Sequence, residues 1–195
     1  MKVLVFIALF LIWLYIISVL KRSGAAGWAY YFGLCTTVIF LVIYCRDFCM
    51  PIISQITLRI CSILGDMTGL YTTYVNYGVI CVDTDTQVQM YLDYECAGVF
   101  EMFMFAASAL FFPLYKNIKK ILVLCTGLLW VLFANVLRII FIASSTSILG
   151  SWFYLTAHGF IGRLLIFYPL AVFMWWKLFT KPQIMAQKVG AFTYD

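Results

Sequence analysis

The chain has 195 residues, of which 65% are hydrophobic and 19% aromatic but only 11% charged. Soluble domains are nearer half apolar and a quarter charged, so this composition excludes an ordinary soluble protein and indicates a membrane protein with several spans. The net charge of +5 comes from basic residues dispersed beside apolar segments rather than gathered in patches, which argues against a nucleic-acid partner.

Five apolar segments are long enough to cross a membrane as helices: about 3–20, 27–45, 96–115, 121–143 and 159–177. We therefore expect an all-α polytopic fold, with residues 1–195 forming one integral membrane domain. The first segment follows Lys2 as in a signal peptide. Its length of about eighteen residues and the lack of a small-x-small cleavage pattern favour a retained helix.

The segment 46–95 is the one substantial stretch without a predicted span, and we expect it to lie outside the cytoplasm. Residues 51–64 are apolar but interrupted by Gln55 and Arg59, which favours an interfacial or re-entrant helix. A short sixth span here is the alternative, but it is expected to invert the topology of everything that follows. Residues 71–93 are rich in β-forming residues around a turn at 83–86, which predicts a small β-hairpin.

The flanking charges predict the orientation of the chain. One side of the predicted membrane carries eight basic residues and a single acidic one, Asp195; the basic residues are Lys21, Arg22, Lys116, Lys119, Lys120, Lys177, Lys181 and Lys188. The other side is mostly acidic. The positive-inside rule therefore predicts a multi-pass protein of the cell membrane with its N-terminus outside and its C-terminus in the cytoplasm.

Three polar residues are predicted to lie at the same depth near the outer face: Cys96, Arg138 and the only histidine, His158. At about 1.5 Å per helical residue, each lies about 27–30 Å from the lysines at the far end of its span, which is one hydrocarbon thickness. A thiol, a guanidinium and an imidazole at one depth are typical of thiol-based acyl transfer. The sequence therefore predicts a catalytic site there.

Each of these residues also has a structural interpretation. Cys96 is one of seven cysteines in the chain, but it is predicted to lie at a helix N-terminus, where the helix dipole and a nearby cation favour the thiolate. Arg138 is either an interfacial anchor or a functional cation, and Asn135 shares its helix face. His158 titrates near neutral pH, which favours function, although a lone histidine is more often structural.

Glu101 and Arg163 are predicted to lie at matching depths inside the membrane. Each is about 21–22 Å from the lysine level at the end of its own span. An intramembrane ion pair between them is expected to hold the third and fifth spans together, a structural role first and a catalytic one second. The cysteines and the single histidine lack the spacing of a zinc site, so no metal is expected.

Three short motifs carry a resemblance to a known family. They are Glu95-Cys96-Ala97-Gly98, Ala-Asn135-x-x-Arg138, and His158 followed four residues later by Gly162. Their order and spacing over about residues 70–177 resemble the catalytic core of the exosortase/archaeosortase family of membrane-embedded cysteine transpeptidases. This chain is shorter than many exosortases and has fewer spans before that core.

The resemblance implies a protein-sorting activity. A secreted protein with a short motif, an apolar C-terminal helix and a basic tail is cut at the outer membrane face, and its new C-terminus passes to a membrane lipid or other envelope acceptor. Cys96 then attacks the scissile carbonyl, His158 acts as general base and acid, and Arg138 stabilises the oxyanion or holds the carbonyl. The resemblance implies that four further residues support this catalytic site: Glu95, Gly98, Asn135 and Gly162. It implies no cofactor or metal.

Two other functions remain open from the residues alone. One is a thiol-redox membrane enzyme that uses Cys45, Cys49, Cys61 or Cys81; it predicts that Arg138 and His158 are dispensable. The other is a non-catalytic membrane subunit of an envelope assembly system. That function predicts that the chain tolerates Cys96→Ser.

Overall fold

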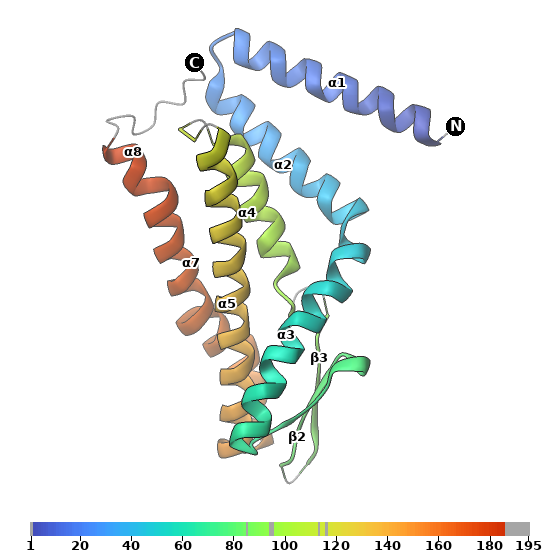
Figure 1. Cartoon of the computed structure of the whole chain (residues 1–195), viewed down its shortest axis with the longest axis vertical. Helices are drawn as coiled ribbons and strands as arrows, with labels where there is room; N and C mark the ends of the chain where they lie inside the picture. The colour runs from blue at the N-terminus through green and yellow to red at the C-terminus, as the bar shows by residue number, and fades with distance from the viewer. Residues whose placement is uncertain (1, 85, 94–95, 113, 116, 186–195) are drawn as a thin grey trace.

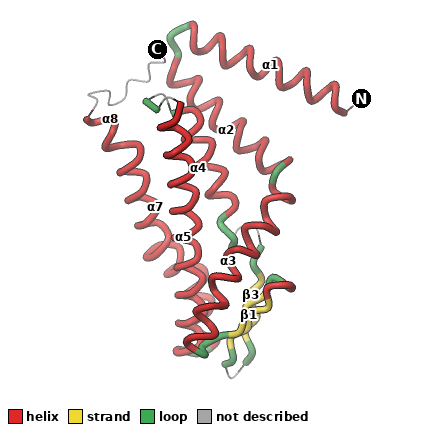
Figure 2. Tube along the Cα trace, viewed as in Figure 1, coloured by secondary structure: helices red, strands yellow, loops and turns green. Residues whose placement is uncertain are grey.

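The protein is a bundle of long helices with a small sheet packed at one end (Figures 1 and 2). The computed structural model describes residues 2–84, 86–93, 96–112, 114–115 and 117–185. By length and apolar composition, four helices are able to cross a membrane: Gly27–Tyr44, Arg46–Thr68, Ile118–Leu149 and Ser151–Met185. A fifth apolar helix, α4 (Val99–Phe111), is shorter. This confirms the predicted all-α polytopic membrane fold.

The predicted spans correspond to helices whose lengths differ from expectation. Helices α1 (Lys2–Arg22) and α2 (Ala26–Tyr44) match the predicted ranges closely. Helix α4 has only 13 residues instead of about 20, because Gly98 takes a left-handed conformation at its start and Phe112 is extended at its end. Pro113 follows Phe112 in the sequence, and a proline disfavours helical backbone in the residue before it.

The last two helices are longer than predicted. Helix α5 (Asn117–Leu149) has 33 residues, and the final helix runs over 35 residues, Ser151–Met185. This final helix changes winding along its length, from the 3₁₀ turn η2 (Ser151–Phe153) through α6 (Tyr154–Thr156), the π-helical η3 (Ala157–Phe167), α7 (Tyr168–Trp175) and the π-helical η4 (Trp176–Thr180) to α8 (Lys181–Met185). At about 1.5 Å per residue, both helices reach about 50 Å and exceed a hydrocarbon core of about 30 Å.

Helix α1 lies across one end of the bundle, whereas α5 and α7 run along it (Figure 1). The indole N–H of Trp13 donates a hydrogen bond to Thr36 Oγ1 at 2.6 Å, and the Trp13 ring meets the edge of Phe111 at 6.2 Å between centroids. These contacts tie α1 to α2 and to the end of α4. The predicted first span is therefore a helix, but its direction differs from that of the other long helices.

Residues 51–64 belong to α3 (Arg46–Thr68), a continuous 23-residue helix that is longer than predicted and long and apolar enough to cross a membrane. Its interfacial or re-entrant placement stays a prediction. Its buried side chains recur every three or four residues, while Gln55 and Arg59, the two residues on which that prediction rested, are exposed. Helix α3 follows α2 through Cys45 and continues away from the α1–α2 connection (Figure 1). It therefore does not invert the direction of the segments that follow.

The predicted hairpin is confirmed as β2 (Val79–Val82) and β3 (Val88–Tyr91), an antiparallel pair around the turn that includes Asp83. A third strand, β1 (Thr72–Tyr74), pairs with β2 and was not predicted. The run from Tyr71 looks like one strand, but a 3₁₀ turn, η1 (Val75–Tyr77), and Gly78 at φ 70° divide it in two. The inner face of the sheet packs on α3 and α5; the buried residues in that cluster include Leu58, Cys61, Ile80, Val82, Met90, Ile139 and Ile142.

The chain direction places the connections at opposite ends of the bundle. Helix α4 returns from the sheet region toward the α1–α2 connection, α5 runs back toward the sheet end, and the final helix returns again (Figure 1). Lys21, Arg22, Lys119, Lys120, Lys177 and Lys181 thus lie toward the end opposite the sheet, as the charge pattern predicts. Lys116, Lys188 and Asp195, which also entered that charge count, lie outside the described residues.

Candidate active site

Cys96 lies in the turn between β3 and α4, and this turn is held by Asp93. The Asp93 carboxylate accepts a hydrogen bond from the Cys96 backbone N–H at 2.8 Å, and the Asp93 carbonyl accepts one from the Ala97 N–H, also at 2.8 Å. Ala97 is fully buried, so the turn is also held by packing against the protein interior. The thiol therefore sits on a short, well-anchored connection just ahead of α4 rather than inside a helix.

His158 directly precedes the predicted final span and lies within the observed final helix, from which it approaches Cys96. The His158 Nε2 atom is 3.8 Å from Cys96 Sγ, within reach of an S–H···N hydrogen bond. The Tyr154 ring stacks on the imidazole at 5.5 Å with 21° between the planes, because the two residues are one helical turn apart. Nδ1 is buried and has no hydrogen-bond partner among the described residues.

The histidine begins an unusual stretch of helix. From Ala157 to Phe167 the chain is wound as a π-helix, which is rare over this length and is often found at functional sites. This wider winding sets where His158 projects relative to α5. Gly162, which was predicted to support the site, lies on the side of the π-helix that packs on α5, where a β-carbon at this position would be 3.1 Å from Ile142 Cδ1 and 2.8 Å from the Ala157 carbonyl.

Arg138, on α5, lines the same cavity as Cys96 and His158. Its side chain is only 2% exposed, and its Nε atom has no hydrogen-bond partner among the described residues. The guanidinium interacts electrostatically with Cys96 and with Glu101. A buried cation of this kind in an apolar helix is costly unless it meets a polar partner, so its place beside the thiol favours a functional role.

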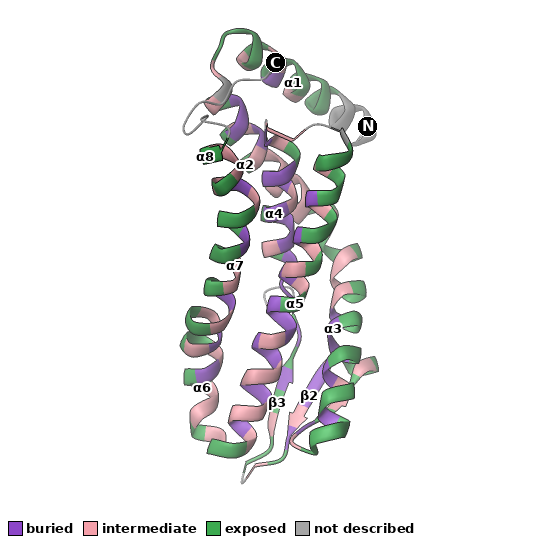
Figure 3. Ribbon diagram, turned by 60° about the vertical axis from the view of Figure 1, so that its left-hand side comes forward, coloured by how far each residue is buried: buried purple, intermediate pink, exposed green. Residues whose placement is uncertain are grey.

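Asn135 connects α5 to the cysteine turn. It is fully buried, and its side-chain N–H donates a hydrogen bond to the Cys96 carbonyl at 2.8 Å. Asn135 lies three residues before Arg138, so both side chains project from the same face of α5. That face is marked by buried residues at helical spacing along the lower half of α5 (Figure 3). Asn135 therefore fixes the backbone of the thiol while Arg138 supplies the charge.

A narrow cavity joins these groups. It is lined by Met90, Tyr91, Leu92, Cys96, Arg138, Ile139, Ile142, Tyr154 and His158. The volume is about 10 Å³, close to the room that one water molecule needs. The thiol, the imidazole and the guanidinium thus line one small cavity, so a nucleophile, a base and a cation lie close together.

The pKa of Cys96 is raised to about 11, and burial is the largest cause. The negative charge of Asp93 and its hydrogen bond to the thiol raise the pKa further, whereas Arg138 and Arg163 lower it. The predicted lowering by a nearby cation is therefore present but is outweighed by burial and Asp93. The resting cysteine is a neutral thiol, which needs a base to become a nucleophile.

We expect Asp93→Asn to lower the pKa of Cys96, because the substitution removes a negative charge while an amide oxygen can still accept the backbone hydrogen bond. The thiolate fraction at pH 8–9 then rises, and the pH curve of Cys96 alkylation by iodoacetamide shifts to lower pH with a several-fold faster rate at pH 8. Peptide mass spectrometry of membranes measures this rate. Asp83→Asn, in the exposed turn of the sheet, serves as the control, and equal curves for the two variants contradict the expected role of Asp93.

Gly98 allows α4 to approach α5. Its φ is +75°, and a β-carbon here would lie 3.1 Å from Asn135 Cγ and 3.3 Å from Asn135 Nδ2. Only glycine combines this backbone conformation with so close a neighbour at little cost. The position thereby keeps the Asn135 amide against the Cys96 carbonyl.

We expect Gly98→Ala to destabilise the protein by about 1–3 kcal/mol, from left-handed strain and from displacement of Asn135. The free energy of unfolding in detergent with a denaturant measures the loss. Gly24→Ala is a matched control, because Gly24 also has φ +75° but a β-carbon at that position would have no atom within 4 Å. An equal loss in both variants shows that strain alone acts and that the Asn135 contact adds nothing.

The structure brings together most of the predicted site residues: Cys96, Gly98, Asn135, Arg138, His158 and Gly162. Glu95 lies outside the described residues. The Glu101–Arg163 ion pair stays a prediction; Glu101 Oε2 is buried without a hydrogen-bond partner among the described residues, and Glu101 interacts electrostatically with Arg138.

Two residues of the site were not predicted. Asp93 stands three residues before Cys96, a spacing typical of an aspartate that accepts a hydrogen bond from a nearby backbone N–H, and this signal was available in the sequence. Tyr154 is the second residue of the site that was not predicted from the sequence. Its spacing of four residues from His158 is the helical spacing of a stacked pair, and it lines the cavity.

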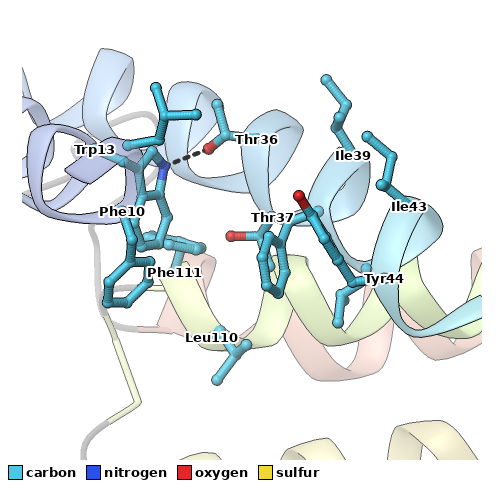
Figure 4. A pocket seen from close by; sticks show the side chains of 12 residues that line it. Phe10, Trp13, Thr36, Thr37, Ile39, Ile43, Tyr44, Leu110 and Phe111 are labelled. Atoms are coloured by element: carbon cyan, nitrogen blue, oxygen red, sulfur yellow. Dashed lines mark hydrogen bonds between the residues drawn. The ribbon is translucent and has the colours of Figure 1, made fainter. Parts of the chain in front are cut away.

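A much larger apolar groove lies away from this site. It has a volume of about 740 Å³ and runs between α1, α2 and the end of α4, with Trp13 and Thr36 joined by their hydrogen bond on one wall and Thr37 on another (Figure 4). None of the residues that line it carries a charge. Without a charged side chain or a thiol among these lining residues, its size does not make it the site of chemistry.

Comparisons with protein-family models, with curated proteins and with solved structures give no match to this chain.

Proposed function

We propose that this protein is a membrane-embedded cysteine peptidase or transpeptidase. It removes the C-terminal sorting signal of secreted proteins and transfers the new C-terminus to a membrane lipid or other envelope acceptor. The observation that carries the proposal is the 3.8 Å approach of His158 Nε2 to Cys96 Sγ beside the buried Arg138. The sequence resemblance to exosortases points to the same chemistry.

The proposed reaction begins with a neutral thiol. Nε2 of His158 takes the thiol proton as Sγ bonds to the scissile carbonyl carbon, and the oxyanion forms beside the Arg138 guanidinium. When the C–N bond breaks, His158 passes its proton to the departing amine. The product is a thioester on Cys96 and a released apolar tail.

The second half of the reaction reverses these roles. The acceptor, an amine or a hydroxyl, attacks the thioester carbonyl while His158 takes its proton. The C–S bond breaks, and His158 returns the proton to the sulfur. Water in place of the acceptor gives simple hydrolysis with the same proton movements.

The charge distribution supports a location at the outer face of the cell membrane. The lysine-rich end of the bundle is assigned to the cytoplasm by the positive-inside rule. The site lies on the sheet side of α4, about 20 Å from the far end of that 13-residue helix. A substrate with an apolar helix then places its scissile bond at the level of Cys96 while its basic tail lies in the cytoplasm.

The experiment is C-terminal peptide mass spectrometry of envelope proteins from a parent strain and a Cys96→Ala strain. We expect one or more proteins to retain an apolar C-terminal tail only in the Cys96→Ala strain. Cys49→Ala is the matched control, because Cys49 is also a half-buried thiol but packs on Ala97 and Val99 and does not line the cavity of Cys96 and His158.

The outcomes separate the three functions. Retained tails in Cys96→Ala alone support the transpeptidase. Loss of function in Cys49→Ala with a tolerated His158→Gln favours the thiol-redox enzyme. A stably inserted Cys96→Ala protein with no changed C-terminus overturns the proposal and favours the non-catalytic subunit.

A further inference from the structure

Strand β3 forms one edge of the sheet, and the register shows which of its residues face outward. The strand order is β1-β2-β3, and Leu92 N–H donates to the Gly78 carbonyl at 3.0 Å. In an antiparallel ladder, alternate residues direct both N–H and C=O toward the partner strand. Since Met90 pairs with Ile80, the backbone of Met90 and Leu92 faces β2. The N–H and C=O groups of Gln89 and Tyr91 therefore point away from the sheet.

These outward groups are unused within the described part of the chain. No backbone or side-chain hydrogen bond from another described residue reaches the main chain of Gln89 or Tyr91. Both side chains are exposed, and Tyr91 is 66% exposed. An edge strand with unpaired groups is a ready template for another extended chain.

The free edge opens onto the candidate site. Tyr91 lines the same cavity as Cys96 and His158, and β3 leads within five residues from Tyr91 to Cys96. A segment paired along this edge therefore runs toward the Cys96 thiol. The exposed face of the sheet beside it is a groove of mixed polar and apolar character, lined by Thr72, Tyr74, Tyr77, Val79, Cys81, Asp83, Gln87 and Gln89.

We propose that the extended segment of the substrate just before the scissile bond adds to the free edge of β3 as a fourth strand. This inference rests on the proposed function and names how the same site takes its substrate. Main-chain hydrogen bonds to Gln89 and Tyr91 hold the segment, and they place the scissile carbonyl between Sγ of Cys96 and Arg138.

The direction of the added strand follows from the path of the chain. Strand β3 runs from the sheet end of the molecule toward the turn at Cys96, and α4 continues toward the lysine-rich end (Figure 1). A substrate that enters from outside and continues as an apolar helix runs the same way. The added strand is therefore parallel to β3, and each outward residue bonds to two alternate residues of the substrate. The substrate copies the enzyme's own order of strand, turn and apolar helix.

The test removes one outward N–H without removing a bond of the sheet. Gln89→Pro deletes a donor on the free edge, where proline is tolerated in strands. Thr73→Pro is the matched control. The backbone N–H and C=O of Ile80 face β3, so those of Val79 and Cys81 face β1. Thr73 pairs with Ile80, and its own backbone groups therefore point outward on the opposite edge of the sheet. The readout is processing of the proteins whose tails are retained in the Cys96→Ala strain. We expect Gln89→Pro to slow processing by roughly two- to tenfold and Thr73→Pro to leave it unchanged.

Gln89→Ala separates the side chain from the backbone, since it keeps the N–H; a larger loss in Gln89→Pro than in Gln89→Ala supports pairing. A second arm leaves the enzyme unaltered and places proline at each of the six residues before the cleavage site of a processed protein. Pairing predicts loss at every second position. Equal processing by Gln89→Pro and Thr73→Pro, or a substrate scan without alternation, overturns the added strand. If no tail is retained in Cys96→Ala, the proposed function itself fails, which is a different result.

Discussion

Replacing His158 by glutamine is expected to slow tail removal at pH 7 by about 10³–10⁴-fold. The pKa of Cys96 is about 11, so only about one thiol in 10⁴ is ionised at pH 7 without a base to take its proton. Nε2 is 3.8 Å from Sγ, and in the proposed reaction His158 is that base; glutamine cannot take the proton. Because the variant depends on free thiolate, its rate should rise about tenfold per pH unit up to pH 10. Single-turnover processing of a substrate peptide in detergent from pH 6 to pH 10 measures this.

The control keeps the stacking partner and removes only the hydroxyl. Tyr154→Phe preserves the aromatic contact with the imidazole at 5.5 Å and is expected to retain the pH profile of the parent. A His158→Gln enzyme whose rate falls but stays flat with pH contradicts the assignment of His158 as the base. Full activity in that variant removes the histidine from the mechanism altogether.

Replacing Arg138 by methionine together with Glu101 by glutamine is expected to lower kcat by about 10²–10³-fold while the protein remains at least as stable as the parent. The guanidinium is 2% exposed in an apolar helix, so the fold bears the cost of its burial. An apolar side chain of similar length removes that cost together with the charge beside the developing oxyanion. Opposite effects on rate and stability are the mark of a residue retained for chemistry. Thermal unfolding in detergent and single-turnover kinetics give the two values.

Glu101 determines how the stability result is interpreted. Arg138 and Glu101 interact electrostatically, so Arg138→Met alone removes one positive charge that favours the ionised Glu101 carboxyl. The double variant Arg138→Met with Glu101→Gln removes this imbalance and should be the more stable of the two. Arg138→Lys is expected to recover little activity, because an ammonium does not reproduce the planar guanidinium. Stability lost in both methionine variants, with activity kept, shows that Arg138 is structural.

Much of the fold follows from the sequence because apolar length and flanking charge decide it. Residues 27–45 and 121–143 were placed within helices by hydropathy alone, and the hairpin around Asp83 by its β-forming residues and turn. The errors arose where the apolar pattern does not mark the end of an element. The left-handed Gly98 and the extended Phe112 bound α4 within an apolar run, and α5 continues past residue 143 because serine and threonine do not stop a helix that packs on a neighbour.

The convergence of Cys96, Arg138 and His158 was predictable because helical rise converts sequence distance into depth. Depth does not give the lateral neighbours of a side chain, however. The stacking of Tyr154 on His158, the bond from Asn135 to the Cys96 carbonyl and the π-helical winding after Ala157 all depend on how helices pack. The raised pKa of Cys96 has the same origin: a nearby cation was expected to dominate, but burial and Asp93 outweigh it.

The central claim is that Cys96 carries the substrate as a thioester, and acid-quenched peptide mass spectrometry tests it most directly. The purified protein is mixed with a peptide that contains the cleavage site of a processed protein and is quenched within one turnover. We predict that the Cys96 peptide gains the mass of the N-terminal part of that substrate, and that neutral hydroxylamine removes this adduct. An unmodified Cys96 while the apolar tail is still released contradicts the account.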